Sequence, residues 1–181
     1  MDYTPYILPG VGLVLALILV LFLRFVYKTY NSIAWQRMQV DRQASHIEAH
    51  LKKKFDLIPS LTEVVKGYAK HEKGTLEEVT RLRSQWGSAK GAEEKMKTAN
   101  LLESALSKLL VVQEKYPNLK ADRSFSNIQK SIYYVEKELL HERKVYNKKV
   151  SYYNIKLEQF PSNLIGKLFN FKPRDFFTTN E

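Results

Sequence analysis

The chain opens with a segment that is apolar without interruption. No charged residue occurs between Asp2 and Arg24, and residues 11–23 (VGLVLALILVLFL) are almost entirely aliphatic. The run reaches the length of about 20 residues that a helix needs to cross the hydrocarbon core of a bilayer. A helix of a soluble protein would keep a polar face, which this run lacks. The pattern therefore predicts a membrane anchor within residues 1–24, formed by Ile7, Leu8, Val11, Leu13, Leu15, Leu17, Leu19, Leu21 and Leu23.

The residues around this run argue against a cleaved signal peptide and indicate an orientation. A signal peptide has a basic N-terminal region and a small-residue cleavage site, whereas this run follows Asp2 and contains no A-x-A pattern. The positively charged residues that follow the run are Arg24, Lys28, Arg37 and Arg42. Positive residues remain on the cytoplasmic side of a membrane. We therefore expect a single-pass protein of the cytoplasmic membrane, with its N-terminus outside and its main domain in the cytoplasm.

Beyond residue 24 the apolar residues recur every three or four positions, which is the spacing of one helix face. No stretch alternates with a period of two residues, and no Asn-Gly or Asp-Gly pair indicates a hairpin. The first helix is predicted to continue from the anchor to about residue 58. Pro59 then ends or kinks it, because proline lacks a backbone donor and clashes with the preceding turn. We expect Asp56 and Pro59 to form a structural corner at this point.

Three further helices complete the pattern. Their predicted ranges are residues 61–86, 92–115 and 122–160, separated by a loop at residues 87–91 and by Tyr116-Pro117-Asn118. Thr75 and Glu78 form a capping-box pattern, which favours a local restart of the second helix after Gly74. Short connections favour antiparallel neighbours. The predicted fold is therefore all-α: a transmembrane helix followed by an antiparallel bundle, most simply of four helices, with long first and last members.

Three parts are expected along the chain: the N-terminal segment and anchor at residues 1–24, a cytoplasmic bundle at residues 25–160, and a short amphipathic C-terminal segment at residues 161–181. The last part mixes apolar groups with cations, as a segment at a membrane surface does. Its candidate membrane-interface residues are Leu164, Ile165, Lys167, Leu168, Phe169, Phe171, Lys172 and Arg174. The alternative is that the same residues fold back and close the open end of the bundle.

Two charged residues fall on apolar helix faces. Arg37 lies on the stripe of the first long helix, and Glu142 lies on that of the last. A buried charge without a partner is costly, so we interpret both as candidate buried polar residues that pair if the two helices are adjacent. The alternative is that Arg37 reaches the rim of the bundle and Glu142 is exposed.

Composition narrows the classes of function. The chain has a formal net charge of +10 and no cysteine. Without cysteine, disulfide scaffolds, thiolate zinc sites and cysteine nucleophiles are excluded. The excess of lysine and arginine suits the anionic cytoplasmic leaflet of a membrane. Because solvated helix faces carry the same basic runs, we expect the lipid bilayer as a partner and no nucleic acid.

The histidines and carboxylates do not form a recognisable catalytic or metal pattern. His46 and His50 are spaced like a chelating pair, but Glu48 is misplaced for an H-E-x-x-H motif. Glu138 and His141 match the Glu-x-x-His step of di-iron bundles, but no second such step is present. The sequence also lacks a Gly-x-Ser-x-Gly elbow and a phosphate-binding loop. We therefore expect no catalytic residue, no cofactor and no metal.

Six segments carry a family resemblance. They are residues 50–60 (HLKKKFDLIPS), 64–72 (VVKGYAKHE), 109–121 (LLVVQEKYPNLKA), 153–154 (YN), 160–165 (FPSNLI) and 169–171 (FNF). In these segments the chain resembles the LemA family of membrane-anchored bacterial and archaeal proteins, and the likeness covers nearly the whole chain. The resemblance implies a single-pass protein with an antiparallel helical domain and no established chemistry.

The function predicted from these observations is non-catalytic: a membrane-anchored helical scaffold or adaptor at the cytoplasmic face of the membrane. Because the first and last helices outrun the third, apolar residues near the membrane would lack a cover, and we expect self-association there. An unknown membrane-protein partner is a further expectation. The alternatives are a membrane-tethered accessory factor that binds nucleic acid and, third, a metal-dependent enzyme.

Overall fold

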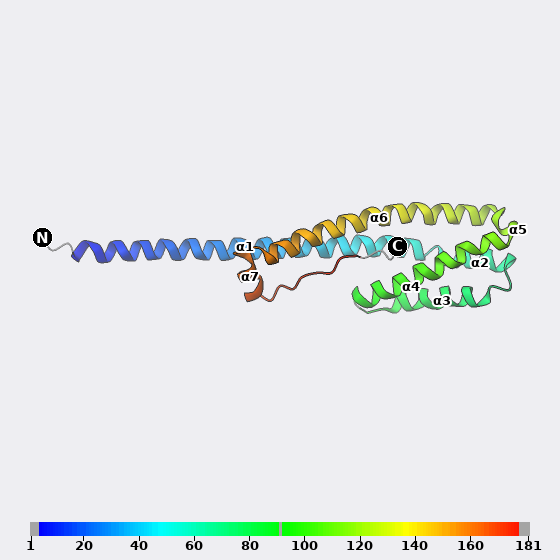
Figure 1. Cartoon of the computed structure of the whole chain (residues 1–181), viewed down its shortest axis with the longest axis horizontal. Coiled ribbons are helices and arrows are strands. Elements are labelled where there is room, and N and C mark those ends of the chain that lie inside the picture. The colour runs from blue at the N-terminus through cyan, green and yellow to red at the C-terminus, as the bar shows by residue number, and fades with distance from the viewer. Residues whose placement is uncertain (1–3, 91, 178–181) are drawn as a thin grey trace. The chain divides into compact units, whose positions relative to one another are not determined.

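The computed structural model describes residues 4–90 and 92–177, and Figure 1 shows their course. Its helices are α1 (Thr4–Phe55), α2 (Ile58–Tyr68), α3 (Lys73–Ser88), α4 (Ala92–Val111), the 3₁₀ helix η1 (Val112–Lys115), α5 (Pro117–Lys120), α6 (Arg123–Glu158) and α7 (Ser162–Leu168). The described residues contain no strand. The predicted all-α class and the long apolar N-terminal helix are therefore confirmed.

The chain forms two compact units. Residues 1–44 and 143–181 belong to one, which we call the terminal unit, and residues 45–142 form the other, which we call the central unit. Both α1 and α6 contribute to both units. Residues 25–160, which the sequence pattern assigned to one bundle, are therefore shared between the two units.

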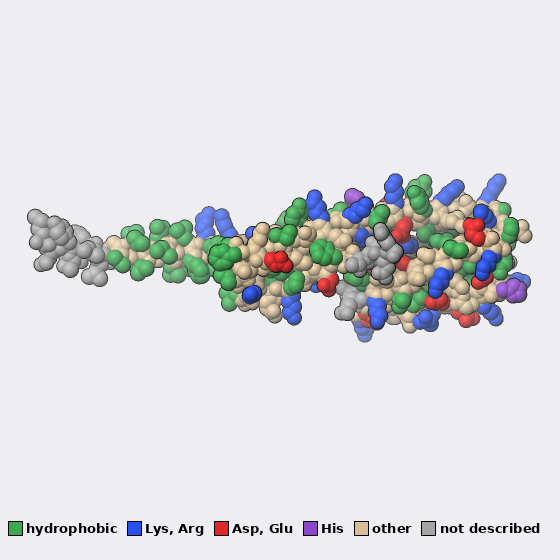
Figure 2. All heavy atoms as spheres, viewed as in Figure 1, with side chains coloured by type: hydrophobic (Ala, Val, Ile, Leu, Met, Phe, Trp, Pro, Cys, Tyr) green, Lys and Arg blue, Asp and Glu red, His purple; other side chains and the backbone are tan. Residues whose placement is uncertain are grey.

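The first part of α1 is apolar and exposed. Every large apolar side chain from Val11 to Leu23 is between 53% and 72% exposed, and Figure 2 shows hydrophobic side chains covering this stretch. From Gly10 onward the helix is long and apolar enough to cross a membrane, judged by length and composition, and its most apolar window has no buried residue. A soluble helix would bury its apolar side chains against a neighbour. This stretch of α1 is therefore the candidate anchor.

The core of the central unit lies between four antiparallel helical segments. These are the end of α1 followed by α2, then α3, α4 and the first part of α6 (Figure 1). α3 packs along α4, and α2 contacts α3 and α5. The buried apolar residues of this unit include Ile47, Leu51, Phe55, Ile58, Leu61, Val65, Leu76, Val79, Leu82, Trp86, Ala99, Leu102, Leu106, Leu109, Leu119, Phe125, Ile132, Val135 and Leu139. Because they recur at helical spacing, each helix buries one continuous stripe.

The ends of α3 differ from the predicted ones. The capping-box pattern placed a restart after Gly74, but α3 begins at Lys73, and Thr75 lies inside the helix. At its other end α3 continues past Gly87, where a loop was predicted. Trp86 is buried in this last turn, and tertiary packing of that kind outweighs the small cost of one glycine in a helix.

Asp122 caps the N-terminus of α6. Its carboxylate accepts a hydrogen bond from the backbone N–H of Phe125 at 2.9 Å and another from the Tyr68 hydroxyl at 2.9 Å. These two bonds hold the pKa of Asp122 below its ordinary value, and the contact raises the pKa of Tyr68. The carboxylate therefore satisfies an orphan N–H at the start of α6 and ties that end to α2.

The terminal unit packs α1 residues 24–44 with α6 residues 143–158, α7 and the extended chain that follows α7 (Figure 1). Its buried apolar residues include Ile33, Val40, Tyr146, Val150, Tyr153, Ile165 and Phe177. A cis peptide bond between Phe160 and Pro161 connects α6 to α7.

α7 ends in a Schellman motif that reverses the chain. The N–H of Phe171 donates to the carbonyl of Gly166 at 2.9 Å, and the N–H of Asn170 donates to the carbonyl of Lys167 at 3.1 Å. Asn170 has φ 55°, and asparagine is, after glycine, the residue that most often occupies this left-handed position. The turn sends residues 171–177, which we call the C-terminal strap, back along α6.

Candidate functional site

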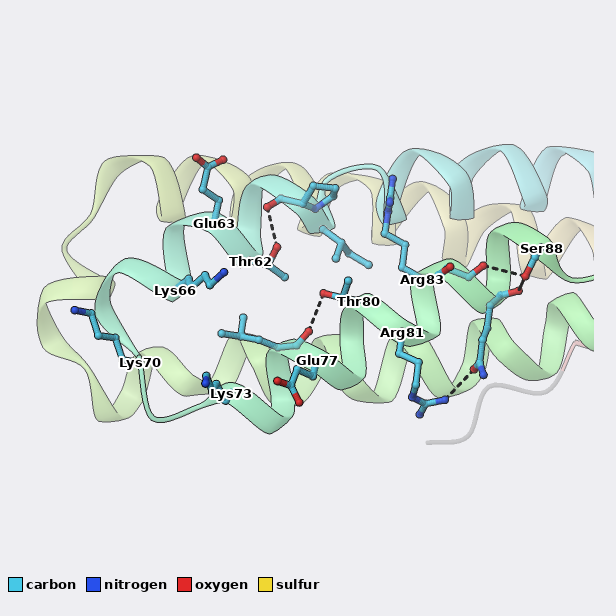
Figure 3. Close-up of a pocket in the computed structure, with 15 residues that line it drawn as sticks. Thr62, Glu63, Lys66, Lys70, Lys73, Glu77, Thr80, Arg81, Arg83 and Ser88 are labelled. Carbon is cyan, nitrogen blue, oxygen red and sulfur yellow. Dashed lines mark hydrogen bonds between the residues drawn. The ribbon is translucent and has the colours of Figure 1, made fainter.

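A groove of about 1200 Å³ lies between α2 and α3 in the central unit, and Figure 3 shows its lining. Apolar atoms of Ile58, Pro59 and Leu76 line part of it. The hydroxyl of Thr62 donates to the Pro59 carbonyl at 2.8 Å, and that of Thr80 donates to the Leu76 carbonyl at 2.8 Å. Because both hydroxyls bond to their own helix, the groove offers an apolar surface more than a polar one.

Positive charge dominates the lining of this groove. The charged residues that line it are Glu63, Lys66, Lys70, Lys73, Glu77, Arg81 and Arg83. Arg83 is engaged at the corner between α1 and α2, where its Nε donates to the Phe55 carbonyl at 3.1 Å. Lys66, Lys70 and Lys73 are exposed. An apolar floor with cations around it suits a segment that carries both apolar and acidic side chains.

Charged side chains also meet at a second place in the central unit, around Lys54. The side chain of Lys54 is only 7% exposed, and its Nζ lies 3.3 Å from Glu103 on α4 and also bonds Glu136 on α6. One helical turn away, Nδ1 of His50 lies 3.3 Å from Glu138. The Lys54 ion pairs therefore join three helices inside the unit.

Sequence reasoning did not single out Lys54, although a signal was present. Lys54 lies three residues after Leu51 and seven after Ile47, so it falls on the buried stripe of α1. Its place within a run of three lysines suggested a solvated face. A cation in the last turn of a helix also interacts favourably with the helix dipole, which adds to its ion pairs.

The two residues of the predicted corner lie at the turn between α1 and α2. Asp56 accepts a hydrogen bond from Lys52 at 2.9 Å and lies 3.6 Å from Arg83. The bond from Lys52, with the charge of Arg83, holds the pKa of Asp56 below its ordinary value. Pro59 stands in the first turn of α2, where its missing N–H leaves no bond unmade.

The interpretation of Arg37 as a buried residue is wrong. Arg37 is exposed, and its guanidinium lies 5.3 Å from the centre of the Phe171 ring. Glu142 is half-buried on α6. The buried arginine is Arg143, whose guanidinium lies 5.3 Å from the Phe177 ring and which lies four residues after Leu139, so the stripe of α6 continues through it.

Side chains of α6 hold the C-terminal strap by its backbone. Asn154 bonds both the N–H and the carbonyl of Arg174, at 3.0 and 2.8 Å, and Asn147 bonds both groups of Phe177, at 2.8 and 3.0 Å. The Tyr153 hydroxyl donates to the carbonyl of Lys172 at 2.9 Å. Each asparagine side chain thus forms, with one residue of the strap, the pair of hydrogen bonds that a neighbouring β-strand would otherwise provide.

Two buried phenols and one exposed ion pair also hold the strap. Tyr146, whose hydroxyl donates to the Asp175 carbonyl at 3.3 Å, and Tyr153 both have a pKa raised by burial. Arg174 lies 2.9 Å from Asp41 on α1. The strap is therefore fastened to both long helices of its unit.

The structure divides the eight candidate membrane-interface residues into two groups. Ile165 is buried, Phe171 is half-buried with its ring 5.5 Å from that of Tyr30, and Arg174 pairs with Asp41. The second group remains exposed: Leu164, Lys167, Leu168, Phe169 and Lys172. The Arg174 side chain is also exposed, apart from its ion pair. The segment thus folds back onto the helices, as the alternative interpretation expected, while part of its apolar surface faces outward.

The histidine and carboxylate pairs of the sequence do not converge on a metal site. His46 and His141 are exposed, and His50 contacts Glu138. In the part of the chain that the structure describes, no group of three or more histidine, aspartate or glutamate side chains could hold a metal ion.

Comparison with known proteins identifies the family. Two curated relatives are the magnetosome proteins MamQ 1 and MamQ 2 of Paramagnetospirillum magneticum, each 28% identical over 74 residues. This match covers 41% of the chain and only 27% of each relative, so the chain matches about a quarter of their length. The model of the LemA family matches residues 43–181, which include α2 to α7 and the strap. The chain therefore belongs to the LemA family.

Proposed function

We propose that this chain is a single-pass, membrane-anchored helical scaffold that is not an enzyme, with its two units in the cytoplasm. One observation carries the proposal: α1 presents an exposed apolar stretch and then continues without a break into the packed helices. A helix that is continuous from lipid into a folded unit holds that unit at the membrane with little freedom. Such a tether serves binding and positioning.

The orientation rests on the charges that follow the apolar stretch. Arg24 and Lys28 are exposed directly after it, and such residues remain on the cytoplasmic side. Because the chain has no cysteine, a single-cysteine variant such as Ser84→Cys reports topology without background. We expect an impermeant maleimide to label Ser84→Cys only after the cells are permeabilised. Labelling in intact cells would overturn the orientation, and release of the protein by carbonate without detergent would overturn the anchor.

The groove between α2 and α3 is the proposed binding face for a partner protein. Its cations and apolar floor complement an amphipathic helix that carries acidic residues, and we propose such a helix as its occupant. A photo-cross-linker at Thr62 tests this in cells. We expect a cross-linked product that is lost on the double charge reversal Lys66→Glu with Lys73→Glu. The product should persist with Lys130→Glu, an exposed lysine on α6. A product that is indifferent to the groove charges contradicts the proposal.

Self-association is the second part of the proposal. We propose that a second copy of the chain covers an exposed apolar face of the terminal unit. In the terminal unit, α1 and α6 line a hollow of about 600 Å³ with both polar and apolar side chains. The exposed apolar ones are Trp35, Tyr152 and Ile155, and Met38 lies one turn along α1. When two copies are anchored in one membrane, their equivalent faces lie at the same distance from the bilayer. A two-fold symmetric dimer requires this arrangement. Confinement to two dimensions also raises the effective concentration.

Mass measurement in nanodiscs or mild detergent tests the self-association. We expect the wild-type chain to be dimeric or larger, and Trp35→Glu to shift it to the monomer. Tyr133→Glu, which changes an aromatic residue of the central unit that is 66% exposed, is the control and should leave the mass unchanged. A wild-type chain that is monomeric at every concentration would contradict self-association.

A further inference from the structure

α7 presents apolar side chains that the terminal unit does not cover. Leu164 is 56% exposed and Leu168 is 72% exposed, and these two residues lie one turn apart on the same face of α7. Phe169 follows them and is 46% exposed. We call Leu164, Leu168 and Phe169 the outer face of α7. Leu164 and Leu168 lie on the helix and Phe169 directly follows it, so three large apolar side chains are exposed within six residues. A cluster of exposed apolar side chains favours an apolar cover.

The outer face cannot turn inward, because the opposite face of α7 is fixed. Ile165 and Gly166 are buried, and a Cβ atom on Gly166 would lie 3.0 Å from a methyl carbon of Leu157 on α6. The Ser162 hydroxyl lies 2.7 Å from the carbonyl of Lys156, which ties the start of α7 to the end of α6. α7 is therefore held with one face against α6 and the other outward.

The position of α7 along α1 indicates what covers the outer face. The ring of Phe169 lies 4.7 Å from that of Tyr30, seven residues beyond Leu23 and the end of the exposed apolar stretch. Seven residues of helix rise about 10 Å. The headgroup region extends about 5–8 Å beyond the hydrocarbon core on each side. Because α7 is itself about 10 Å across, its outer face reaches that region when the apolar stretch of α1 fills the core.

Cations surround this part of the unit. Arg24 and Lys28 follow the apolar stretch of α1, and Lys167 and Lys172 flank the outer face of α7; all four are exposed. Figure 2 shows basic and hydrophobic side chains gathered where the exposed stretch of α1 meets the rest of the terminal unit. Apolar residues with neighbouring lysine and arginine side chains favour a membrane that carries anionic lipid.

We propose that the outer face of α7 inserts into the headgroup layer of the membrane that α1 spans and binds anionic lipid there. This inference rests on the proposed anchor. With two contacts instead of one, the terminal unit cannot rotate freely about α1, and the orientation of the long helices to the bilayer is set. The C-terminal segment would then be both the closure of its unit and a second membrane contact.

Depth-dependent quenching in the full-length chain tests the inference. The chain has no cysteine, so the variants Leu17→Cys, Leu168→Cys and Leu101→Cys can each carry one fluorophore after reconstitution in vesicles. Leu17 lies in the apolar stretch of α1, and Leu101 is 52% exposed on α4. The vesicles contain phosphatidylcholine and phosphatidylglycerol, with a nitroxide either on the headgroup or near the bilayer centre.

We expect the label at Leu17→Cys to be quenched most strongly by the nitroxide near the centre. The label at Leu168→Cys should be quenched several-fold more strongly by the headgroup nitroxide than the label at Leu101→Cys. The double change Lys167→Glu with Lys172→Glu in the Leu168→Cys chain should weaken this headgroup quenching, as should vesicles without phosphatidylglycerol. If the headgroup quenching is unchanged both by the double charge reversal and by the absence of phosphatidylglycerol, the role of anionic lipid is overturned.

The three labels separate the possible failures. If the label at Leu17→Cys escapes quenching, the anchor itself fails and the inference fails with it. If that label is quenched while the label at Leu168→Cys behaves like that at Leu101→Cys, the anchor stands and the second membrane contact is wrong. A disulfide between two Leu168→Cys chains would then identify a second copy as the cover of the outer face.

Discussion

The central and terminal units are held together by different interactions. In the central unit, four helical segments bury continuous apolar stripes, with rings such as Phe55 and Trp86 edge to face at 5.0 Å. In the terminal unit, two helices leave a seam that the C-terminal strap covers, and Asn147, Asn154 and Tyr153 hold the strap by its backbone. Burial of apolar area is non-directional, whereas these hydrogen bonds depend on the exact placement of single side chains.

The difference indicates a division of labour. A core built from apolar stripes tolerates change at its surface, so the central unit can present the groove between α2 and α3 without depending on it for stability. A strap held by directional bonds at its backbone can detach locally while its unit remains folded. The effects of mutations in the two units should therefore differ in their magnitude and in how much of the structure they reach.

The largest expected effect is on the central core. Phe55 is 1% exposed, so Phe55→Ala removes a packed ring and should lower the free energy of unfolding by about 3–5 kcal/mol. Phe160→Ala is the matched control, because Phe160 is 79% exposed and its loss should have little effect.

The chain has two tryptophans, Trp35 in the terminal unit and Trp86 in the central unit. Denaturant unfolding in detergent can therefore follow each unit by fluorescence in Trp35→Phe or Trp86→Phe chains. Phe55→Ala should shift the transition that Trp86 reports more than the one that Trp35 reports. Equal shifts would show that the two units unfold as one.

The second effect concerns the buried cation of the central unit. Lys54→Ala leaves the carboxylates of Glu103 and Glu136 without their cation and should cost about 3 kcal/mol in unfolding free energy. Lys53→Ala is the control, since the Lys53 side chain is 63% exposed. The pair Lys54→Met with Glu103→Leu should recover most of the loss, because the two more buried charges are replaced by apolar groups, while the Glu136 side chain is 44% exposed and reaches solvent. A loss that the double variant does not reduce would assign the effect to packing.

The third effect should be confined to the strap. Asn154→Ala removes both hydrogen bonds to Arg174, which should raise the amide exchange rate of that residue roughly 10- to 100-fold through a local opening. The transition of Trp86 in the central unit should not move. Asn127→Ala, at an exposed residue of α6, is the control. A general loss of protection would show that the strap is needed for the whole fold.

The smallest effect is a dependence of the strap on alkaline pH. Burial raises the pKa of Tyr146 and Tyr153 above their ordinary value of about 10, so the folded state favours the neutral phenols. Their contribution is fully present below pH 10 and is lost as the pH rises through the raised values.

A spin label on Phe176→Cys measures this release. Its mobility should stay constant up to about pH 10 and increase above it. Tyr153→Phe should reduce the alkaline increase, while weakening the strap by about 1 kcal/mol through the lost bond to Lys172. An increase in mobility that begins well below pH 10 would assign the release to another group.

Periodic patterns predicted the helices well, and local signals predicted their ends less well. The stripes on α1, α3, α4 and α6 are the faces that the two units bury. The predicted cap at Thr75 lies inside α3, because the helix begins two residues earlier, at Lys73, with Glu72 in the N-cap position. Assignment of a charged residue to the inside failed by one position on α6, where Arg143 is buried and Glu142 is half-buried.

The sites depended on information that a single stretch of sequence does not contain. Lys54 stands in a run of lysines, and only the approach of Glu103 and Glu136 from other helices offsets the free-energy cost of burying its charge. The groove between α2 and α3 arises from the spacing of two helices. The first joins residues far apart in the chain, and the second depends on how two consecutive helices pack.

The length and composition of one segment were enough to predict the apolar helix, because a bilayer imposes a length and excludes polar groups. Helical spacing was enough to predict the all-α class and the buried stripes, because burial selects for that period. For the C-terminal segment the sequence predicted a membrane-interface position and left closure of the bundle as the alternative, since the same residues suit both. The tertiary structure turned Phe177 inward, because Asn147 was in position to bond its backbone. It turned Ile165 inward and left Leu164 and Leu168 outward, because the bond from Ser162 to Lys156 and the close approach of Gly166 to Leu157 hold α7 against α6.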